Sequence, residues 1–261
     1  MTKEQKYPTD LTDAQWEYIS PFLPVSNGQG RPPLDIRQVL NALLYLLIGG
    51  IPWRLLPNDF PNRKSVYHYF WKWRKDGTWG RIYEALYKCE RERQGRAPEA
   101  SAGCLDSQSV KNVGGAQEAR GYDAGKKITG RKRHLLVDTL GLPIAVKVTA
   151  ASVSDQAGAR ELLAEMKDKV LHLQKIWVDG TYRGADWHAA VQKDYGIALE
   201  VVQNEPGVKG FVPQAKRWVV ERTFGWLVQA RRLVREYEKL AASTEAMIKL
   251  ALIRLLVRRL A

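Results

Sequence analysis

The spacing of the apolar residues changes at residues 95–103, GRAPEASAG, a short stretch rich in small residues. Before this stretch, apolar residues recur at the three- and four-residue spacing of amphipathic helices. After it, short apolar runs bounded by turn residues alternate with longer helical patterns. We therefore expect a helical domain over residues 1–97 and an α/β domain over residues 98–261.

The α/β domain is predicted to contain strands at residues 103–110, 134–140, 143–150, 175–179 and 197–203. Helices are expected at residues 155–171, 185–195, about 216–234 and 244–260. Three strands followed by alternating helices and strands is the order of the ribonuclease H-like fold, a mixed sheet flanked by helices. In that fold the first and fourth strands are central neighbours, so acids at their ends come close together.

The helical domain has the order of a helix-turn-helix. Residues 35–50, DIRQVLNALLYLLIGG, show a helical apolar stripe that ends in two glycines. After the short PWRLLP turn, residues 62–77 form a helix of basic and aromatic residues. A small helical bundle without a ligand could show the same order, but the layout favours a helix that reads a DNA groove. Its DNA-contacting side chains would be Arg63, Lys64, Lys72, Arg74 and Lys75.

The charge of the chain indicates a polyanionic partner. Lysine and arginine total 41 against 28 acids, a net charge of +13. The net charge is +5 over residues 111–134 and +7 over residues 213–261, but −2 over residues 135–212. Clustered basic side chains bind nucleic acid by displacing counterions from phosphates. An acidic middle between basic flanks suits a carboxylate site held on DNA, although solvated helix faces are also often basic.

Composition excludes several classes of protein. Hydrophobic residues make up 45% and charged residues 26%, which excludes collagen-like, disordered and disulfide-scaffold chains. The longest apolar segment, residues 39–51, is shorter than the roughly 18 residues of a membrane span, and the N-terminus lacks a signal-peptide pattern. Cys89 and Cys104 form no C-x-x-C pair, which indicates a reducing compartment. We expect no membrane partner and a bacterial cytoplasmic location, at the nucleoid when the protein is bound to DNA.

Three acids fall on the elements where a ribonuclease H-like metal nuclease keeps its ligands. Asp106 lies in the first strand, Asp179 ends the fourth, and Glu221 lies on the helix expected near residues 216–234. A carboxylate inside an apolar strand is costly unless a cation pairs with it. Three carboxylates can hold two magnesium ions, which activate water and stabilise the leaving oxygen at a phosphodiester.

Other interpretations of the acids remain open. Asp179 precedes a glycine and could be a strand-ending turn, and Glu221 could be paired with a neighbouring arginine. Asp138 is a rival ligand, but it lies at a predicted hairpin turn, where aspartate is common. Asp155 is the stronger rival, although its position suggests a helix cap, a role that either Ser154 or Asp155 could take.

Residues 121–134, GYDAGKKITGRKRH, are predicted to form a glycine-rich basic loop. Its glycine spacing does not match a phosphate-binding Walker loop. We expect it to clamp DNA phosphates beside the acids, the alternative being a flexible basic surface loop. The cations of this clamp are Lys126, Lys127, Arg131, Lys132 and Arg133.

Three further residues are candidates for supporting roles. His134 would either point toward Asp106, outside the metal ligands, or be a structural histidine. Arg231 and Arg232 follow Glu221 and could grip DNA ends, or could simply be solvated. No zinc-protease, serine-hydrolase or cysteine-histidine motif is present in the sequence.

The motifs together resemble the DDE transposases of bacterial insertion sequences. The resemblance is carried by LDSQSVK, GRKRHLLVDTLG, WVDGTYRG and RWVVERTFGWL, followed by RRL and EYEKL. GIPWRLLP, YHYFWKW and GTW are similar to the DNA-binding region of the insertion-sequence-five family, in particular its short members with a fused reading frame. The resemblance extends over nearly the whole chain.

This resemblance implies that Asp106, Asp179 and Glu221 are the metal-binding triad of a ribonuclease H-like catalytic domain. Arg217 matches the arginine of the family signature around the glutamate. The sequence departs from that signature at Gln214, where a tyrosine is expected, and at Val228, where a lysine is expected.

We therefore expect a transposase that binds its terminal inverted repeats, cuts there and joins the 3′-OH to target double-stranded DNA. Two Mg²⁺ ions, replaceable by Mn²⁺, would serve the reaction. Because two DNA ends must be brought together, a homodimer or larger assembly on DNA is expected. The alternatives are a metal-dependent nuclease that does not join strands and a transposase-derived DNA-binding regulator.

Overall fold

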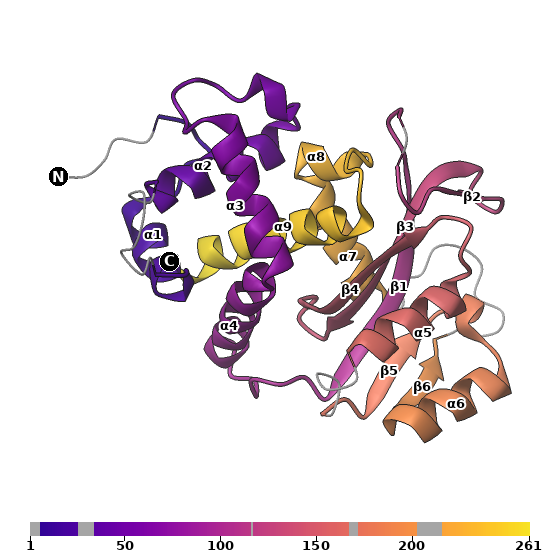
Figure 1. The fold of residues 1–261 in the computed structure, drawn as a ribbon. Helices are drawn as coiled ribbons and strands as arrows, with labels where there is room; N and C mark the ends of the chain where they lie inside the picture. The colour runs from indigo at the N-terminus through magenta and orange to yellow at the C-terminus, as the bar shows by residue number, and fades with distance from the viewer. Residues whose placement is uncertain (1–5, 26–33, 116, 167–171, 203–215) are drawn as a thin grey trace. The chain divides into compact units, whose positions relative to one another are not determined.

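The structure, a computed structural model, describes residues 6–25, 34–115, 117–166, 172–202 and 216–261 (Figure 1). These residues fall into two compact units. The helical unit consists of the residues up to 98 together with residues 227–237 and 242–261, and the α/β unit of residues 99–226 and 238–241. The division expected from the sequence, into domains of residues 1–97 and 98–261, stays a proposal. The structure adds that the C-terminal helices are grouped with the N-terminal ones.

The helical unit begins with helices whose first turns are capped by side chains. Thr12 caps the first helix through a capping box, Asp35 caps the second and Asn62 caps the third. No helix among the described residues has the length and apolar character needed to cross a membrane. The elements are α1 (Asp13–Ile19), η1 (Ser20–Phe22), α2 (Ile36–Gly49), η2 (Trp53–Leu55), α3 (Arg63–Lys75), α4 (Thr78–Arg93), α8 (Arg231–Val234) and α9 (Ala241–Leu260).

The end of α2 lies directly against α8. Gly50 ends α2 with a φ of +69°, in the left-handed region. A Cβ atom at this position would lie 2.9 Å from the Cβ of Arg231, so only glycine permits the approach. Arg232 is buried, and its Nη1 donates a hydrogen bond of 2.7 Å to the carbonyl of Ile51. The close packing of α8 therefore depends on the glycine.

Aromatic side chains join α3 to α4. Phe70 and Trp73 belong to the buried side of α3. Trp73 meets Trp79 of α4 edge-on, with ring centroids 5.0 Å apart, and the indole N–H of Trp79 donates to the carbonyl of Phe70 at 3.2 Å. These contacts fix which side of α3 is buried and leave its basic and aromatic side exposed.

The α/β unit is built on a mixed sheet. Its strand order is β4-β3-β1-β5-β6, with the short β2 also pairing with β3. β1 runs antiparallel to β3 and parallel to β5. This topology confirms the expected ribonuclease H-like fold, with the two central strands adjacent. The elements are β1 (Ala102–Lys111), β2 (Gly121–Asp123), β3 (Ile128–Asp138), β4 (Pro143–Ala150), α5 (Asp155–Glu165), β5 (Lys175–Val178), η3 (Gly180–Tyr182), α6 (Ala185–Tyr195), β6 (Ala198–Val201) and α7 (Arg217–Val228).

The hydrophobic core of this unit lies between one face of the sheet and the helices α5 and α6 (Figure 1). Leu105, Ile176 and Val178 contribute from the two central strands. Their apolar partners on the helices are Leu162, Leu163, Trp187 and Val191. The core therefore identifies which side chains of β1 and β5 face these helices and which face the opposite side.

Two predicted elements are wrong. The basic loop expected at residues 121–134 is a hairpin of β2 and β3, and β3 begins at Ile128 instead of His134. The helix expected near residues 216–234 is divided into α7 and α8, because Ala230 has an extended backbone with φ −85° and ψ 108°. Both errors affect where the basic side chains lie.

Candidate active site

The pairing of β1 with β5 brings two of the predicted acids together. Ala102 is opposite Lys175, and Cys104 is opposite Trp177. Continued by two residues, this register places Asp179, which directly follows β5, level with Asp106. Neighbouring strands lie about 4.8 Å apart, and residues at the same level share a face. Asp106 and Asp179 therefore lie on neighbouring strands at the carboxyl end of β5.

Asp106 and Asp179 lie on the face of the sheet opposite α5 and α6. Leu105 and Val178, their neighbours in sequence, pack into the core beneath those helices. Because side chains alternate along a strand, the acids point the other way. The start of α7 covers that other face, where the Cys104 Sγ lies 3.1 Å from the carbonyl of Lys216 and the Lys216 Nζ lies 4.0 Å from the centre of the Trp177 ring.

Local backbone donors hold both carboxylates. The Oδ1 of Asp106 accepts a hydrogen bond of 2.7 Å from the N–H of Ser107. The Oδ1 of Asp179 accepts from the N–H of Thr181 at 2.8 Å and also from its hydroxyl. Asp179 thus caps η3, as the turn interpretation expected, while it also lies level with Asp106.

Glu221 is an exposed residue of α7, the helix that begins on the same face. It lies five residues after Lys216, about 7.5 Å farther along a helix. The helix is anchored to the turn after β3, because the Thr223 hydroxyl donates to the carbonyl of Gly141 at 2.6 Å and Arg222 donates to the carbonyl of Leu140 at 2.8 Å.

Negative charge is concentrated around the hydroxyl of Tyr182. Burial raises the pKa of Tyr182 well above its usual value, and Asp106, Asp155 and Asp179 raise it further. Carboxylate oxygens are the ligands that a hard divalent cation prefers, so Asp106 and Asp179 are the acids of this set that would suit one. Within the described part of the chain, no three His, Cys, Asp or Glu side chains are close enough together to hold a metal ion. The meeting of Glu221 with Asp106 and Asp179 therefore stays a prediction.

The two rival acids have other partners. Asp138 accepts hydrogen bonds from the N–H groups of Leu140 and Leu142, both at 2.9 Å, which confirms its role in the hairpin turn. Asp155 does not cap α5, because the cap is Ser154. Instead, Asp155 accepts a hydrogen bond from Ser107.

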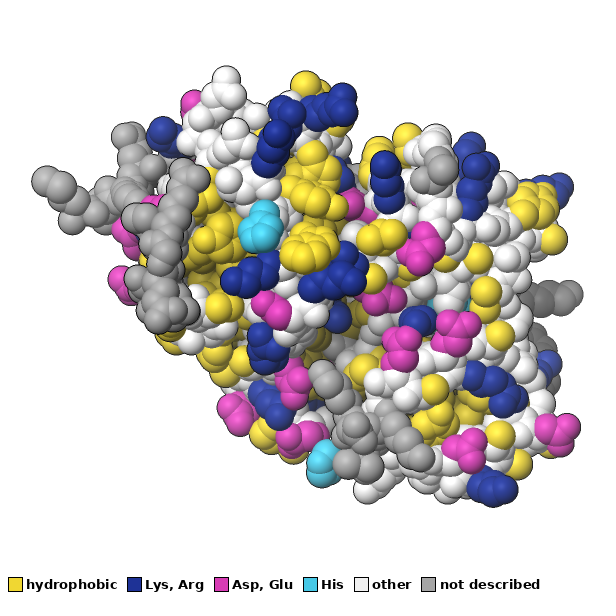
Figure 2. Space-filling view, viewed as in Figure 1, with side chains coloured by type: hydrophobic (Ala, Val, Ile, Leu, Met, Phe, Trp, Pro, Cys, Tyr) yellow, Lys and Arg dark blue, Asp and Glu magenta, His cyan; other side chains and the backbone are white. Residues whose placement is uncertain are grey.

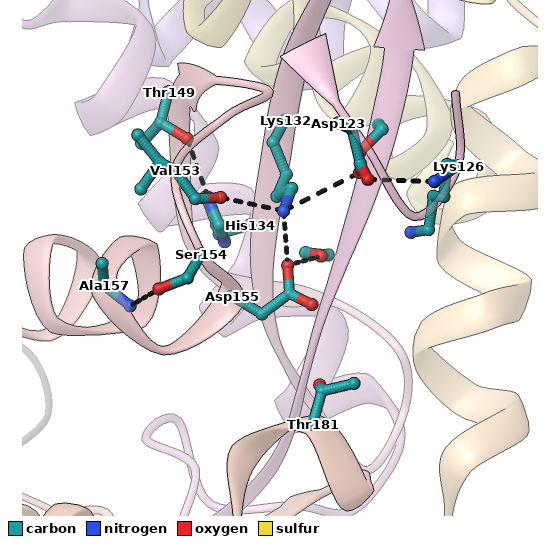
Figure 3. A network of polar contacts seen from close by, with 12 residues as sticks. Asp123, Lys126, Lys132, His134, Thr149, Val153, Ser154, Asp155, Ala157 and Thr181 are labelled. Atoms are coloured by element: carbon teal, nitrogen blue, oxygen red, sulfur yellow. Dashed lines mark hydrogen bonds and ion pairs between the residues drawn. The ribbon is translucent and has the colours of Figure 1, made fainter. Parts of the chain in front are cut away.

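Asp155 belongs to a partly buried polar network centred on the Lys132 ammonium (Figure 3). Its Oδ1 lies 2.6 Å from the Ser107 Oγ and 2.9 Å from the Lys132 Nζ. Lys132 also lies 3.8 Å from Asp123 and donates to the carbonyl of Val153 at 2.8 Å. Burial by itself would raise the pKa of Asp155, but Ser107 and Lys132 outweigh it and hold the pKa below its usual value.

His134 is a structural histidine and does not point toward Asp106. It is opposite Ser107 in the register of β1 and β3, so it shares the face covered by α5. Its Nε2 lies 2.9 Å from the Thr149 hydroxyl, and a Cβ atom on Gly158 would lie 2.1 Å from its ring. Burial lowers the pKa of His134 to about 4, so the imidazole is neutral at physiological pH.

The predicted phosphate clamp is wrong for three of its five cations. Arg131, Lys132 and Arg133 are all buried within β3. Arg131 donates to the carbonyls of Glu118, Glu238 and Lys239 at 2.6 to 3.0 Å. These side chains therefore support the sheet and do not lie on its surface. Lys126 and Lys127, at the turn of the hairpin, are exposed.

The basic residues predicted on helices also differ in exposure. On α3, Arg63, Lys64, Lys72 and Lys75 are exposed, and Arg74 is half-buried. Arg231 is exposed, whereas Arg232 is buried and lies over the Trp53 ring at 5.5 Å, so Arg232 is not available to grip DNA. The side chain of Arg217, like residue Gln214, lies outside the described residues.

Tyr67 and Trp71 lie exposed among the cations of α3, as expected for a basic and aromatic helix, and Figure 2 shows hydrophobic, basic and histidine side chains gathered over this helix. Sequence reasoning did not single out His68 on the same helix. It also did not single out Ser107, Gln156 and Thr181, which contact the acids or the turns that hold them. The helix periodicity of α3 could have revealed His68, whereas the contacts around the acids depend on distant segments.

Family comparisons match transposases along most of the chain. Residues 11–83 match a family described as "Putative transposase of IS4/5 family". Residues 97–209 and residues 176–258 match two families, each described as "Transposase DDE domain". The chain belongs to the DDE transposases of insertion sequences. In this transposase, the first DDE match contains Asp106 and Asp179, and the second contains Asp179 and Glu221.

Two relatives of the transposase come from Burkholderia cepacia. It is 29% identical over 115 residues to "Insertion element IS402 uncharacterized 16.2 kDa protein", covering 41% of this chain and 77% of the relative. It is 32% identical over 127 residues to "Putative transposase for insertion sequence element IS402", covering 46% of this chain and 60% of the relative. The transposase thus spans about three fifths of the second relative.

Proposed function

We propose that this transposase binds the terminal inverted repeats of its insertion sequence, cleaves the DNA at the element ends and joins the freed 3′-OH to target DNA. The observation that carries the proposal is the register of β1 and β5, which makes Asp106 level with Asp179 inside the DDE match. Paired carboxylates from two strands are a suitable base for metal-assisted phosphoryl transfer.

Asp106, Asp179 and Glu221 would hold two Mg²⁺ ions, which Mn²⁺ could replace. Bound there, the ions would supply activation of water and stabilisation of the leaving oxygen at the phosphodiester. The protein's own part is to keep the carboxylates oriented. Ser107 does this for Asp106 through its N–H, and Thr181 for Asp179 through its N–H and hydroxyl.

The exposed side of α3 is the proposed surface for double-stranded DNA. It carries the cations Arg63, Lys64, Lys72 and Lys75, which suit phosphates. Between them lie Tyr67 and Trp71, which are 46% and 42% exposed and suit the apolar edges of bases or sugars. Because joining requires two ends at once, the active assembly would be a homodimer or larger on DNA.

The test uses the full-length protein and duplexes that carry the repeats flanking its gene. With Mg²⁺, the wild type should nick the repeat end and join a pre-cut end to target DNA. Asp106→Ala should lower both rates by at least about 10³-fold, the effect of several kcal/mol, while repeat binding changes less than about twofold. Cleavage without joining would indicate a nuclease, and repeat binding without cleavage a regulator. Either result would overturn the proposal.

A further inference from the structure

The start of α5 contacts the segments that carry both paired aspartates. Its first residue, Asp155, accepts a hydrogen bond of 2.6 Å from the hydroxyl of Ser107, which directly follows Asp106. Its second residue, Gln156, donates to the carbonyls of Thr181 and Arg183 at 3.1 and 2.7 Å. Thr181 belongs to the turn that follows Asp179. One helix end therefore contacts a segment next to each acid.

Each of these contacts leads directly to a carboxylate. The Ser107 N–H donates to Asp106 at 2.7 Å, while its hydroxyl is held by Asp155 on the other face of the strand. The Thr181 N–H donates to Asp179 at 2.8 Å, while its carbonyl is held by Gln156. Ser107 and Thr181 thus link the helix to the acids, one for each strand.

The position of α5 is itself fixed. Ser154 caps the helix by accepting from the N–H of Ala157 at 3.2 Å. The Lys132 ammonium lies between Asp155 and Asp123 in Figure 3 and pairs with Asp155 at 2.9 Å. Buried charges keep their geometry when they are paired and hydrogen-bonded in this way. Asp155 is thereby occupied by Lys132 and Ser107.

We propose that Asp155 and Gln156 are positioning residues, which set the separation of Asp106 and Asp179 through Ser107 and Thr181. The inference rests on the proposed function of those two acids. It assigns Asp155 a role outside the metal ligands, and it assigns Lys132 the task of holding Asp155. Residues that orient metal ligands commonly affect metal affinity about 10- to 100-fold when changed.

The experiment measures Mn²⁺ binding to the full-length protein by electron paramagnetic resonance, in the absence of DNA. Ser107→Ala and Gln156→Ala should each raise the Mn²⁺ dissociation constant about tenfold. Ser107→Thr, which keeps the hydroxyl, should restore wild-type binding. The matched control is Ser109→Ala. Ser109 lies two residues after Ser107 on the same face of β1, and its hydroxyl donates a hydrogen bond to Asp123 instead of Asp155. It should change Mn²⁺ binding less than about twofold.

A second measurement separates positioning from folding. The cleavage rate of each variant is measured as a function of Mg²⁺ concentration, and the unfolding temperature of each variant is recorded. Positioning predicts that Ser107→Ala and Gln156→Ala need about tenfold more Mg²⁺ while repeat binding is retained. If either variant binds Mn²⁺ like the wild type, or if Ser109→Ala weakens Mn²⁺ binding equally, the positioning role of Asp155 and Gln156 is overturned but the proposed function is not. A wild type that binds no Mn²⁺ overturns the proposed function as well.

Discussion

At the residue scale, the structure shows why a run of three cations can be part of a buried strand. Arg131 is buried because backbone carbonyls accept its guanidinium hydrogen bonds, and Lys132 because two carboxylates and a carbonyl surround its ammonium. Buried charge is tolerated where partners replace water. In the sequence, the same residues indicate a surface loop, since their partners lie in other segments.

Replacing Lys132 should therefore destabilise the protein without a comparable direct effect on DNA binding. Lys132→Met leaves Asp155 and Asp123 without their cation and should lower the free energy of unfolding by about 3 kcal/mol. Urea unfolding measures this change. The matched control is Lys126→Met at the exposed hairpin turn, which should change it by less than about 0.5 kcal/mol. Equal losses of stability in the two variants would contradict the role of Lys132 as the buried cation that pairs with Asp155 and Asp123.

His134 should make stability depend on pH in the acidic range. Burial lowers its pKa to about 4, whereas an unfolded histidine has a pKa near 6.5. The unfolded chain therefore takes up a proton between about pH 6.5 and pH 4 that the native protein does not, so stability is complete above this window and falls as pH decreases through it. The loss should amount to about 3 kcal/mol.

The measurement is the free energy of unfolding of the wild type and of His134→Gln at pH 7 and pH 4.5. The variant should lose less stability on acidification, because glutamine does not titrate. His68→Gln, which changes an exposed histidine on α3, serves as the control and should behave like the wild type. If His134→Gln and the wild type show the same pH dependence, the imidazole is not buried in its neutral form.

At the element scale, the proposed DNA-binding side of α3 combines cations and aromatic rings, whose contributions to DNA binding salt can separate. The slope of log affinity against log salt is negative, and Lys72→Ala should reduce its magnitude by about one, because one phosphate contact is lost. Trp71→Ala should weaken binding to the repeats about tenfold with the slope unchanged, because its ring carries no charge. The binding of repeat duplexes is measured between about 50 and 200 mM salt.

The control for α3 is Lys88→Ala on α4, which removes the same charge from a lysine that pairs with Glu84 at 3.7 Å. It should leave the salt slope within about 0.3 of the wild type, because a solvated ion pair releases no DNA counterions. A greater loss of slope magnitude for Lys88→Ala than for Lys72→Ala would contradict the proposal that α3 binds DNA.

Elements with local signals were predictable from the sequence, and elements fixed by distant contacts were not. Asn62 and Gly77 delimit α3 close to the expected bounds, because capping and turn residues act within a few positions. The first half of β3 was missed because it pairs with β1, about twenty residues earlier in the sequence, and β2 was missed with it because β2 pairs with that half of β3. For the site, a carboxylate inside an apolar strand indicated Asp106 and a strand end indicated Asp179, but only the fold reveals Gln156 as a partner of the turn after Asp179.

At the scale of the whole molecule, C-terminal segments of the chain belong to the same compact unit as its N-terminal helices. Residues 227–237 and 242–261 are grouped with the residues up to 98. Arg232 donates a hydrogen bond to the carbonyl of Ile51, and the Arg259 guanidinium lies 3.8 Å from the carboxylate of the buried Glu90 of α4. Half of the residues of α9 are buried, and most of these are apolar, including Met247, Ile248 and Leu256. The N-terminal helices therefore share their core with the end of the chain.

A fragment of residues 1–98 should consequently fail to fold by itself. Each large apolar side chain that α9 no longer covers costs about 1.5–3 kcal/mol, and several such losses exceed the 5–15 kcal/mol that stabilise a typical domain. Trp73 and Trp79, buried in the full chain, should then show red-shifted fluorescence and no cooperative thermal transition. A fusion that links residues 1–98 to residues 227–261 should restore both signals, because it supplies the missing helices. Cooperative unfolding of the isolated fragment near the temperature of the full chain would instead show that residues 1–98 hold their own core.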